Sequence, residues 1–393
     1  MSTRRKLAWI ALLYFAEGFP FGLVVDNLPV YFRAHGVSLA AIGMLSVLGL
    51  PWSLKVLWAP LVDRFGVHRR WITGALLVMA LATLAIPLAD PTAPGAFLWA
   101  VLACLTVASA TQDIAIDAYT IGLVVPGEEG VANGVRVSAY RAALIVGGGG
   151  LVVLAGWVGW TPLFWVAAAM LAALAAVAWR TPVVPVARQP AAAWARALVA
   201  WLARPGAPFV LLFVLLYKLG DASMGPMVKP FWLDRGLSVE EIGFVSITLG
   251  VAASVAGALA GGVATSRIGI FRALWALGAL QALSNLGYAG VAATGAGRPA
   301  IYAASLVESF TGGLGTAAFL AFLMHICERE QAATQYALLS ALFGLTRSLA
   351  GAASGFAATR LGYAPYFALT FVLALPAYAL LPWVRRWVHD RPQ

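Results

Sequence analysis

The chain has 393 residues, of which 62% are hydrophobic and 11% charged, and its mean hydropathy is +0.86. This composition excludes a soluble domain with a solvated surface and indicates a protein with many membrane spans. The formal net charge of +10 does not indicate nucleic-acid binding, because the lysines and arginines follow the alternation of the spans.

Twelve apolar segments follow one another between short polar breaks, each near the length of about 20 residues that a helix needs to cross a bilayer. They lack the alternating pattern of membrane β-strands, which favours helices over a barrel. The expected spans are 7–32, 38–62, 71–89, 95–124, 131–156, 160–179, 208–233, 239–265, 273–293, 299–326, 335–359 and 363–388. The sequence therefore predicts an all-α integral membrane protein with twelve transmembrane helices.

The charges between the spans predict the orientation of the chain. Sixteen lysines and arginines lie on the side that holds both termini, and four lie on the other side. By the positive-inside rule, both termini are expected in the cytoplasm. The first hydrophobic stretch is long and contains Glu17, so we expect no cleavable signal peptide. Cys104 and Cys327 fall in a span and at a helix end, where we expect no disulfide.

The chain repeats itself once, at an offset of 200 residues. The run Y-F-R-A-H-G-V-S at 31–38 continues to Ile42 and Gly43, and F-W-L-D-R-G-L-S at 231–238 continues to Ile242 and Gly243. A second echo pairs residues 64–69 with 267–272. The repeat predicts two pseudo-symmetric bundles of six helices in the same orientation, 1–179 and 208–393.

A linker over 180–207 is expected between these halves, because it contains four prolines, four arginines and no acidic residue. Trp194, Leu198, Trp201 and Leu202 recur at helical spacing, while Arg196 lies elsewhere around the helix. This pattern suggests a short cytoplasmic segment on the membrane surface, with a simple basic tether near anionic lipid as the alternative.

The arrangement resembles the major facilitator superfamily, whose parallel halves alternate access around a midplane site. The run D-R-F-G-V-H-R-R at 63–70 looks like the loop motif between helices 2 and 3 of that superfamily. The resemblance implies that Asp63 and Arg64 stabilise a cytoplasmic gate. Helix capping and positive-inside anchoring are the alternative roles for these two residues.

Twelve ionisable side chains lie inside the expected spans, where an unpaired charge is costly and normally serves function. They are Lys55, Arg136, Arg141, Lys218, Lys229, Arg347, Glu17, Asp26, Asp113, Asp117, Asp221 and Glu308. At about 1.5 Å per residue, six of them reach the middle of the bilayer: Glu17, Asp113, Arg141, Lys218, Asp221 and Arg347. Ion pairs that only join helices, and snorkelling by Lys55, are the alternatives to a polar cavity.

Residue spacing relates some of these charges. Asp113 and Asp117 are four residues apart and share a helix face, and Lys55 is a natural counter-ion from the second span. Lys218 and Asp221 are three apart on another face. By contrast, the glycine runs at 147–150 and 312–315 follow no strand and match no nucleotide motif, so they indicate close helix packing.

Several blocks look like the AmpG muropeptide permease family. They are E-S-F-T-G-G-L-G-T-A-A-F at 308–319, L-M at 323–324, A-T-Q-Y-A-L-L-S-A-L at 333–342, L-Y-K-L-G-D-A at 216–222, K-V-L-W-A-P-L-V-D-R at 55–64, Q-D-I-A-I-D-A at 112–118 and Y-R at 140–141. The resemblance covers nearly the whole chain. Some members of that family contain helices beyond twelve, for which this chain has no room.

The resemblance implies proton-coupled import of anhydro-muropeptides across the bacterial inner membrane by alternating access. We expect a monomer embedded in lipid that uses the proton gradient as its energy source and needs no cofactor or metal. With the depth argument, it suggests substrate binding by Lys55, Gln112, Tyr140, Arg141, Tyr217, Lys218, Lys229 and Arg347. Proton coupling would fall to Glu17, Asp113, Asp117 or Asp221. Tyr14 and Asn285 are weaker candidates for contacts with the sugar.

Other functions stay open at this point. The related acetyl-CoA transporter family shares parts of the first-half pattern, so another bulky anion, such as an acyl-CoA, a siderophore or a drug-like solute, is the alternative substrate. A membrane-embedded enzyme is disfavoured, because the four histidines all lie near helix ends and no nucleophile motif is apparent. A receptor that binds without transport is not excluded by the buried charges.

Overall fold

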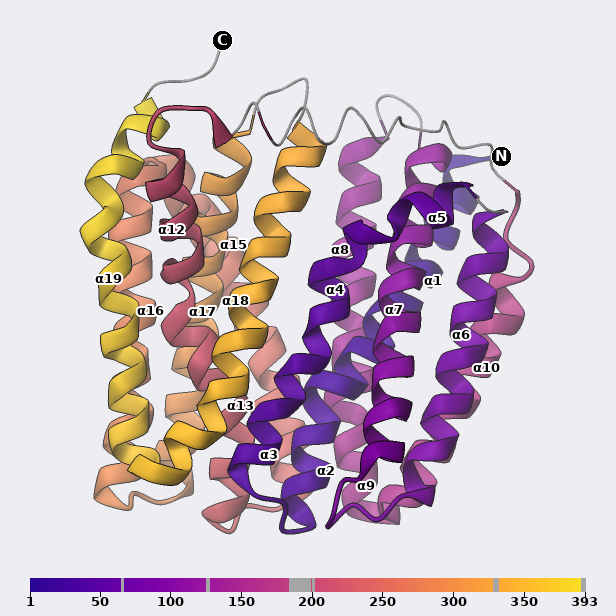
Figure 1. Cartoon of the computed structure of the whole chain (residues 1–393), viewed down its shortest axis with the longest axis horizontal. Coiled ribbons are helices and arrows are strands. Elements are labelled where there is room, and N and C mark those ends of the chain that lie inside the picture. Colours follow the sequence, from indigo (N-terminus) through magenta and orange to yellow (C-terminus); the bar gives the residue numbers. More distant parts are fainter. Residues whose placement is uncertain (65–66, 125–127, 184–198, 200–201, 328–331, 390–393) are drawn as a thin grey trace. The chain divides into compact units, whose positions relative to one another are not determined.

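The computed structural model describes residues 1–64, 67–124, 128–183, 199, 202–327 and 332–389 (Figure 1). Within those residues the regular structure is helical, and no strand is present. Each of the twelve expected spans coincides with described helices. The expected surface segment around Trp194 and Leu198, in the linker 180–207, lies outside the described residues.

Contacts divide the chain into two compact units. Unit 1 comprises Met1–Val37, Leu54–Gln189 and Gly236–Thr248, and unit 2 comprises Ser38–Ser53, Pro190–Arg235 and Leu249–Gln393. Residues 38–53 of the first sequence half thus belong to unit 2, and residues 236–248 of the second half belong to unit 1. The division into bundles 1–179 and 208–393 stays a prediction.

The helices of unit 1 come mainly from the first half of the sequence. They are α1 (Thr3–Gly22), η1 (Leu23–Asn27), α2 (Leu28–Ala34), η3 (Lys55–Leu57), α5 (Ala59–Arg64), α6 (His68–Ala85), η4 (Ile86–Leu88), α7 (Ala96–Leu123), α8 (Glu129–Leu144), η5 (Ile145–Gly150), α9 (Leu151–Val158), α10 (Trp160–Ala178), α14 (Val239–Glu241) and most of η6 (Ile242–Leu249). Here η1, η5 and η6 are π-helical, while η3 and η4 are 3-10 helices.

The helices of unit 2 come mainly from the second half. They are α3 (Leu39–Met44), the 3-10 helix η2 (Leu45–Gly49), most of α4 (Leu50–Leu54), α12 (Ala207–Tyr217), α13 (Leu219–Asp234), α15 (Gly250–Ile268), α16 (Ile270–Thr294), α17 (Arg298–His325), α18 (Ala332–Leu361) and α19 (Tyr363–His389).

Nine helical stretches among the described residues have the length and hydropathy of a membrane crossing. They are Thr3–Ala34, His68–Leu88, Ala96–Leu123, Val131–Val158, Trp160–Ala178, Ala207–Asp234, Val239–Ile268, Arg298–His325 and Tyr363–Trp387. The remaining expected spans correspond to the shorter apolar helix Leu39–Leu54 and to α16 and α18. The class of fold is as expected, and the number of twelve crossings stays a prediction.

The internal repeat has a local physical basis. Gly36 and Gly236 follow the ends of α2 and α13 with φ angles of 79° and 75°, a conformation that glycine adopts without strain. Two residues later, Ser38 and Ser238 begin the next helices as N-caps, accepting hydrogen bonds from backbone N–H groups three residues on. The same turn therefore reverses the chain after the first span of each half.

In unit 1, the end of α1 and the π-helical segment η5 pack closely because glycines face each other. A Cβ atom on Gly22 would lie 2.9 Å from the backbone nitrogen of Gly148. The fully buried Asn27 donates from Nδ2 to the carbonyl oxygens of Gly147 at 2.7 Å and Gly148 at 3.2 Å. The glycine run at 147–150 therefore serves close helix packing, as expected from the sequence.

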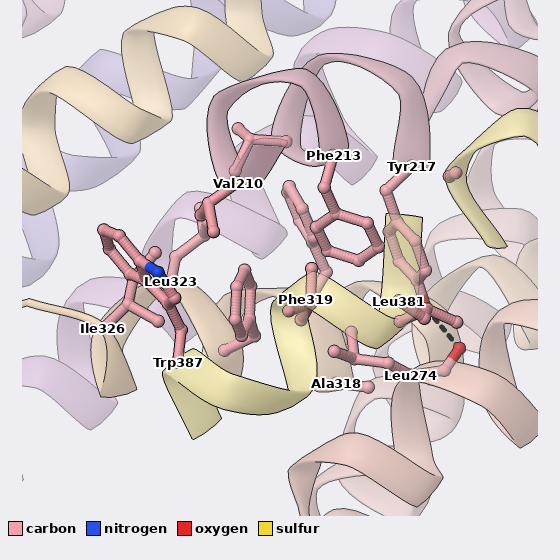
Figure 2. Close-up of a cluster of buried hydrophobic side chains, with 14 of the residues drawn as sticks. Val210, Phe213, Tyr217, Leu274, Ala318, Phe319, Leu323, Ile326, Leu381 and Trp387 are labelled. Atoms are coloured by element: carbon pink, nitrogen blue, oxygen red, sulfur yellow. Dashed lines mark hydrogen bonds between the residues drawn. The ribbon is translucent and has the colours of Figure 1, made fainter. Parts of the chain in front are cut away.

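Unit 2 is held together by a hydrophobic core between α12, α16, α17 and α19 (Figure 2). Phe213 packs edge-on against Phe322, with ring centroids 5.4 Å apart. Tyr217 stacks on Phe319 at 5.2 Å, and its hydroxyl donates to the Leu274 carbonyl at 3.0 Å. Aromatic rings bury large areas and add favourable edge and stacking contacts to such a core. It fixes the end of α12, where the polar site of unit 2 begins.

Candidate functional site

A cluster of six polar side chains forms inside unit 1, and we call it the unit-1 cluster. It consists of Tyr14 and Glu17 on α1, Lys55 on η3, Asp113 and Asp117 on α7, and Arg136 on α8. The Lys55 ammonium nitrogen lies 3.5 Å from Asp113 Oδ2 and 3.7 Å from Asp117 Oδ2. The lysine is thus shared by two carboxylates one helical turn apart, as the spacing on α7 predicts.

Asp117 contacts three other members of the unit-1 cluster. The Tyr14 hydroxyl donates to Asp117 Oδ1 at 2.7 Å, and the Arg136 guanidinium contacts the same oxygen at 3.2 Å. The guanidinium carbon of Arg136 also lies 4.6 Å from the centre of the Tyr14 ring, a cation–π contact that fixes its plane. Asp117 therefore has three partners, namely Tyr14, Arg136 and Lys55.

Glu17 and Asp113 are the deeply buried members of the unit-1 cluster. They are 8% and 7% exposed, whereas the side chains of Lys55, Asp117 and Arg136 are 31%, 33% and 44% exposed. Within the described residues, Glu17 Oε2 and Asp113 Oδ1 are buried without a hydrogen-bond partner. Buried polar oxygens normally have partners, so these two are candidates for function.

Lys55 lies where its transmembrane helix is interrupted. The α-helix ends at Leu54, and residues 55–57 form a 3-10 turn in which the Trp58 N–H bonds to the Lys55 carbonyl at 3.2 Å. Pro60 has no N–H to donate to the Val56 carbonyl, which explains why the regular pattern stops here. Irregular backbone at membrane depth is tolerated where it lies in protein or lines a polar cavity.

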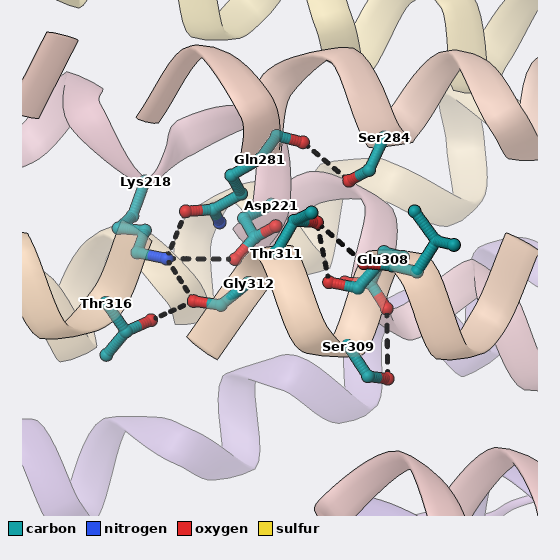
Figure 3. A network of polar contacts seen from close by, with 10 residues as sticks. Lys218, Asp221, Gln281, Ser284, Glu308, Ser309, Thr311, Gly312 and Thr316 are labelled. Atoms are coloured by element: carbon teal, nitrogen blue, oxygen red, sulfur yellow. Dashed lines mark hydrogen bonds and ion pairs between the residues drawn. The ribbon is translucent and has the colours of Figure 1, made fainter. Parts of the chain in front are cut away.

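A second polar cluster forms inside unit 2 around Lys218, and we call it the unit-2 cluster (Figure 3). The buried Lys218 ammonium contacts Asp221 Oδ2 at 3.3 Å, Gln281 Oε1 at 2.7 Å and the Gly312 carbonyl at 3.4 Å. Glu308, the remaining member, interacts electrostatically with Asp221 and Lys218. An ammonium group has three N–H donors, so Lys218 is saturated within this unit.

Lys218 also lies at a helix interruption. With φ of −105° and ψ of 10°, it separates α12 from α13, and its carbonyl accepts the N–H of Ala222 at 2.8 Å. Asp221 follows in the first turn of α13, where the positive end of the helix dipole favours a carboxylate. Its Oδ1 is buried without a hydrogen-bond partner among the described residues, and its side chain is 25% exposed.

The glycine run of α17 shapes the unit-2 cluster. The Gly312 carbonyl accepts from Lys218 and from the Thr316 hydroxyl. A Cβ atom on Gly313 would collide with the Ser254 carbonyl of α15, and one on Gly315 would collide with Gln281 Oε1. Gly313 therefore brings α15 close, while Gly315 leaves room for the glutamine oxygen that binds Lys218.

The other expected site residues occupy diverse positions. Tyr217 is in the core of unit 2, and Gln112 on α7 is fully buried with both amide atoms unpartnered among the described residues. Tyr140 packs against Phe21 with centroids 6.2 Å apart. Five further residues are placed as follows: Arg141 is half-buried on α8, Lys229 is half-buried on α13, Arg347 is exposed on α18, and Asp63 and Arg64 are on α5 with side chains outside the described part.

One member of the clusters, Gln281, was not expected at a site from the sequence. It is one of two amide side chains in the apolar span 273–293, the other being Asn285, and this polarity is the only signal it offers. Arg136 and Glu308 were recognisable as charges within spans, but spacing along one helix does not indicate the partners of either. Tyr14 was only a weak candidate for sugar contact, whereas it binds Asp117.

The sequence matches the family model described as Major Facilitator Superfamily over residues 10–297. The chain belongs to this superfamily. Among curated relatives of this superfamily member, the anhydromuropeptide permease of Escherichia coli (strain K12) is 33% identical over 388 residues, covering 96% of this chain and 79% of that protein. Putative transporter AmpG 4 of Rickettsia felis is 27% identical over 405 residues, covering 98% and 97%. The AmpG resemblance is confirmed.

Solved structures of the superfamily share the fold. A bacterial homologue of the human lysosomal transporter Spinster, in an inward-facing and unoccupied conformation, matches with a TM-score of 0.82 at 15% identity and covers 100% of both chains. The nucleoside transporter NupG matches with a TM-score of 0.76 at 16% identity, again over 100% of both chains. The superfamily and these relatives make the chain a membrane transporter and not an enzyme.

Proposed function

We propose that this protein imports anhydro-muropeptides, the sugar-peptide fragments of peptidoglycan turnover, across the bacterial inner membrane. The observation that supports this most directly is the 33% identity to an anhydromuropeptide permease over 96% of the chain. Similarity spread over both sequence halves is expected when the two proteins share a substrate path rather than a single motif. The proposed orientation has both termini in the cytoplasm, in accord with the distribution of lysines and arginines.

The proposed energy source is the proton gradient, and the proposed mechanism is alternating access in a monomer surrounded by lipid. Buried carboxylates in spans are the usual elements of proton relays. The unit-1 cluster supplies Glu17, Asp113 and Asp117, and the unit-2 cluster supplies Asp221. Each is held next to at least one cation or carboxylate, so its charge depends on what its neighbours bind.

Roles in substrate binding are proposed for several side chains. Muropeptides carry carboxylates, for which the partly exposed Lys55 is suited. Arg141, Lys229 and Arg347 are further proposed partners for anionic groups, and Gln112, Tyr140 and Tyr217 for the sugar and peptide amides. Because Lys218 is saturated by Asp221, Gln281 and Gly312, we assign it an indirect role in which it orients Asp221. Asp63 and Arg64 remain the proposed gating residues.

Uptake into proteoliposomes tests the function. The purified protein should accumulate radiolabelled anhydro-muropeptide when an inward proton gradient is imposed, and a protonophore should abolish the accumulation. Protein-free liposomes serve as the control. Folded protein that transports no muropeptide in either direction would reject the proposed substrate and direct the search to another bulky anion, such as an acyl-CoA or a siderophore.

A separate experiment tests the orientation. Fusions of a reporter that fluoresces only in the cytoplasm should be active at the N-terminus and at the C-terminus. An inactive fusion at either end, with the fusion protein present in the membrane fraction, would overturn the proposed topology.

A further inference from the structure

The unit-1 cluster contains more negative than positive groups. Glu17, Asp113 and Asp117 are three carboxylates, while Lys55 and Arg136 are two cations. Glu17 interacts electrostatically with both aspartates as well as with both cations. Three ionised carboxylates that interact in this way, two of them largely removed from water, repel one another, and two cations leave one negative charge uncompensated. The cluster is therefore complete only when it takes up one more positive charge.

The contacts show where that charge belongs. Asp117 already receives the Tyr14 hydroxyl and the Arg136 guanidinium on one oxygen and faces Lys55 with the other. The buried oxygens without hydrogen-bond partners in the described part of the chain are Glu17 Oε2 and Asp113 Oδ1. The missing positive charge is thus best placed at Glu17 and Asp113, in the least exposed part of the cluster.

A proton fits this position better than a metal ion. One carboxylate oxygen is enough to bind a proton, and the resulting O–H can donate to a neighbouring carboxylate. A metal ion requires several ligands at once. The described residues include no group of three or more histidine, cysteine, aspartate or glutamate side chains that is arranged to hold one.

Lys55 links this position to the surface of the cluster. Its ammonium is shared between Asp113 and Asp117, and its side chain is 31% exposed, so an anionic group of a solute can reach it. An anion that binds Lys55 draws the ammonium away from Asp113 or offsets its charge. Asp113 and Glu17 then lose compensation and bind a positive charge more strongly. By linkage, the bound positive charge strengthens the attraction of Lys55 for the anion by the same factor.

We propose that Glu17 and Asp113 together bind the single coupling proton, and that Lys55 couples its binding to that of a substrate carboxylate. This inference rests on the proposed function, because it requires an anionic substrate. In the step itself, a hydronium ion on the periplasmic side loses a proton, which forms an O–H bond with one carboxylate and leaves water behind. On the cytoplasmic side this O–H bond breaks and the proton passes to a water molecule, so that the carboxylate is ionised again.

Every charged or titratable member of the unit-1 cluster has a part in this arrangement. Tyr14 and Arg136 hold Asp117 in place, and Lys55 is the cation that an anionic solute can reach. Glu17 and Asp113 are the groups that bind the proton. The unit-2 cluster takes no part in this binding, since its lysine is saturated within its own unit, and the role proposed for Asp221 in transport is separate.

The first experiment measures binding of anhydro-muropeptide to the purified full-length protein by calorimetry at pH 6 and pH 8. The wild-type protein should bind at least about tenfold more tightly at pH 6, in the range of ordinary coupling between two sites. In D113N and E17Q, whose amides cannot take up the proton, this difference should shrink to less than about twofold. K55A should bind weakly at both pH values, and K55R should restore part of the pH dependence.

Asp90 supplies a matched control. This carboxylate lies in the loop between η4 and α7, where the Thr92 hydroxyl and backbone N–H bind its Oδ1 at 2.7 and 2.8 Å. Those hydrogen bonds hold the pKa of Asp90 below its usual value, so it stays ionised throughout the experiment. D90N should therefore retain the pH dependence of the wild-type protein.

Transport in proteoliposomes separates the outcomes. D113N and E17Q should lose gradient-driven accumulation at least about tenfold and should lose less of the exchange between labelled and unlabelled muropeptide, which needs no net proton movement. If the two variants accumulate substrate as the wild-type protein does, the proton binds elsewhere. If a sodium gradient drives uptake and a pH gradient does not, the proton assignment is wrong although the transport function stands. A wild-type protein that neither binds nor exchanges muropeptide would instead reject the proposed function.

Discussion

The side-chain oxygen of Gln281 lies 2.7 Å from the ammonium nitrogen of Lys218, at the interruption between α12 and α13. The two residues are 63 positions apart in the sequence. This hydrogen bond and the pair with Asp221 hold a buried cation in place. The indirect role proposed for Lys218 therefore depends on the amide as well as on the charges around it.

Replacing Gly315 by alanine should reduce uptake although no charge is changed. The new Cβ would collide with Gln281 Oε1 and displace it from Lys218. Loss of a hydrogen bond to a charged group of about 1.5 kcal/mol corresponds to roughly tenfold in rate. Initial uptake of labelled muropeptide measures the effect. Gly290→Ala on α16 is the control, because its Cβ would meet open space. Equal uptake by both variants would contradict the positioning role of Gln281.

Replacing Gln281 by leucine should have a similar effect on uptake through a different change. The side chain keeps its approximate volume and loses the acceptor for Lys218, so only Asp221 and the Gly312 carbonyl hold the ammonium. Gln281→Glu, which keeps an acceptor, should recover part of the rate. A leucine variant with wild-type uptake would mean that Asp221 and the Gly312 carbonyl are sufficient partners.

Removing the hydroxyl of Tyr14 should lower the stability of the protein. Tyr14→Phe deletes the donor to Asp117 in a partly buried site, at a cost of about 1–2 kcal/mol. Thermal unfolding in detergent gives the measurement. Tyr363→Phe is a matched control, because its hydroxyl donates to Asp234 at the same 2.7 Å but at an exposed position. The two variants should differ, and an equal change in melting temperature would argue against a buried role for Tyr14.

The contact between α1 and η5 should tolerate no side chain at Gly22. Gly22→Ala places a methyl group 2.9 Å from the Gly148 nitrogen, so the helices must separate. Overpacking of this kind costs about 1–3 kcal/mol. Gly74→Ala on α6 has no atom within 4 Å of the new Cβ and should unfold at the wild-type temperature. Melting curves of the two variants test this prediction. A Gly22→Ala variant that unfolds at the same temperature as Gly74→Ala would show that the contact tolerates a methyl group.

Much of the fold could be predicted from the sequence, because long apolar stretches indicate transmembrane helices and the order of the helices is the order of these stretches in the chain. The contact between Lys55 and the two aspartates also followed from helical spacing, as did that between Lys218 and Asp221. These pairs depend only on local geometry or on one strong electrostatic preference.

Other contacts depend on which distant segments pack together, and local patterns do not contain that information. Gln281 reaches Lys218 only because Gly315 leaves space on a third helix. The sharing of Asp117 between Tyr14 and Arg136 likewise requires α1, α7 and α8 to meet. The π-helical turns η1, η5 and η6 were not expected either.

The exchange of short segments between the units has a consequence for biogenesis. Residues 38–53 leave the ribosome early, yet they belong to unit 2. Within that unit Gly43 packs closely against Gly351 and Gly355 of α18, a helix that is made near the end of translation. Until then this stretch of chain has no final partner in the bilayer. The first half of the chain, expressed alone, should consequently be degraded by membrane quality-control proteases. Co-expression of the second half should restore the amount of the first half in the membrane.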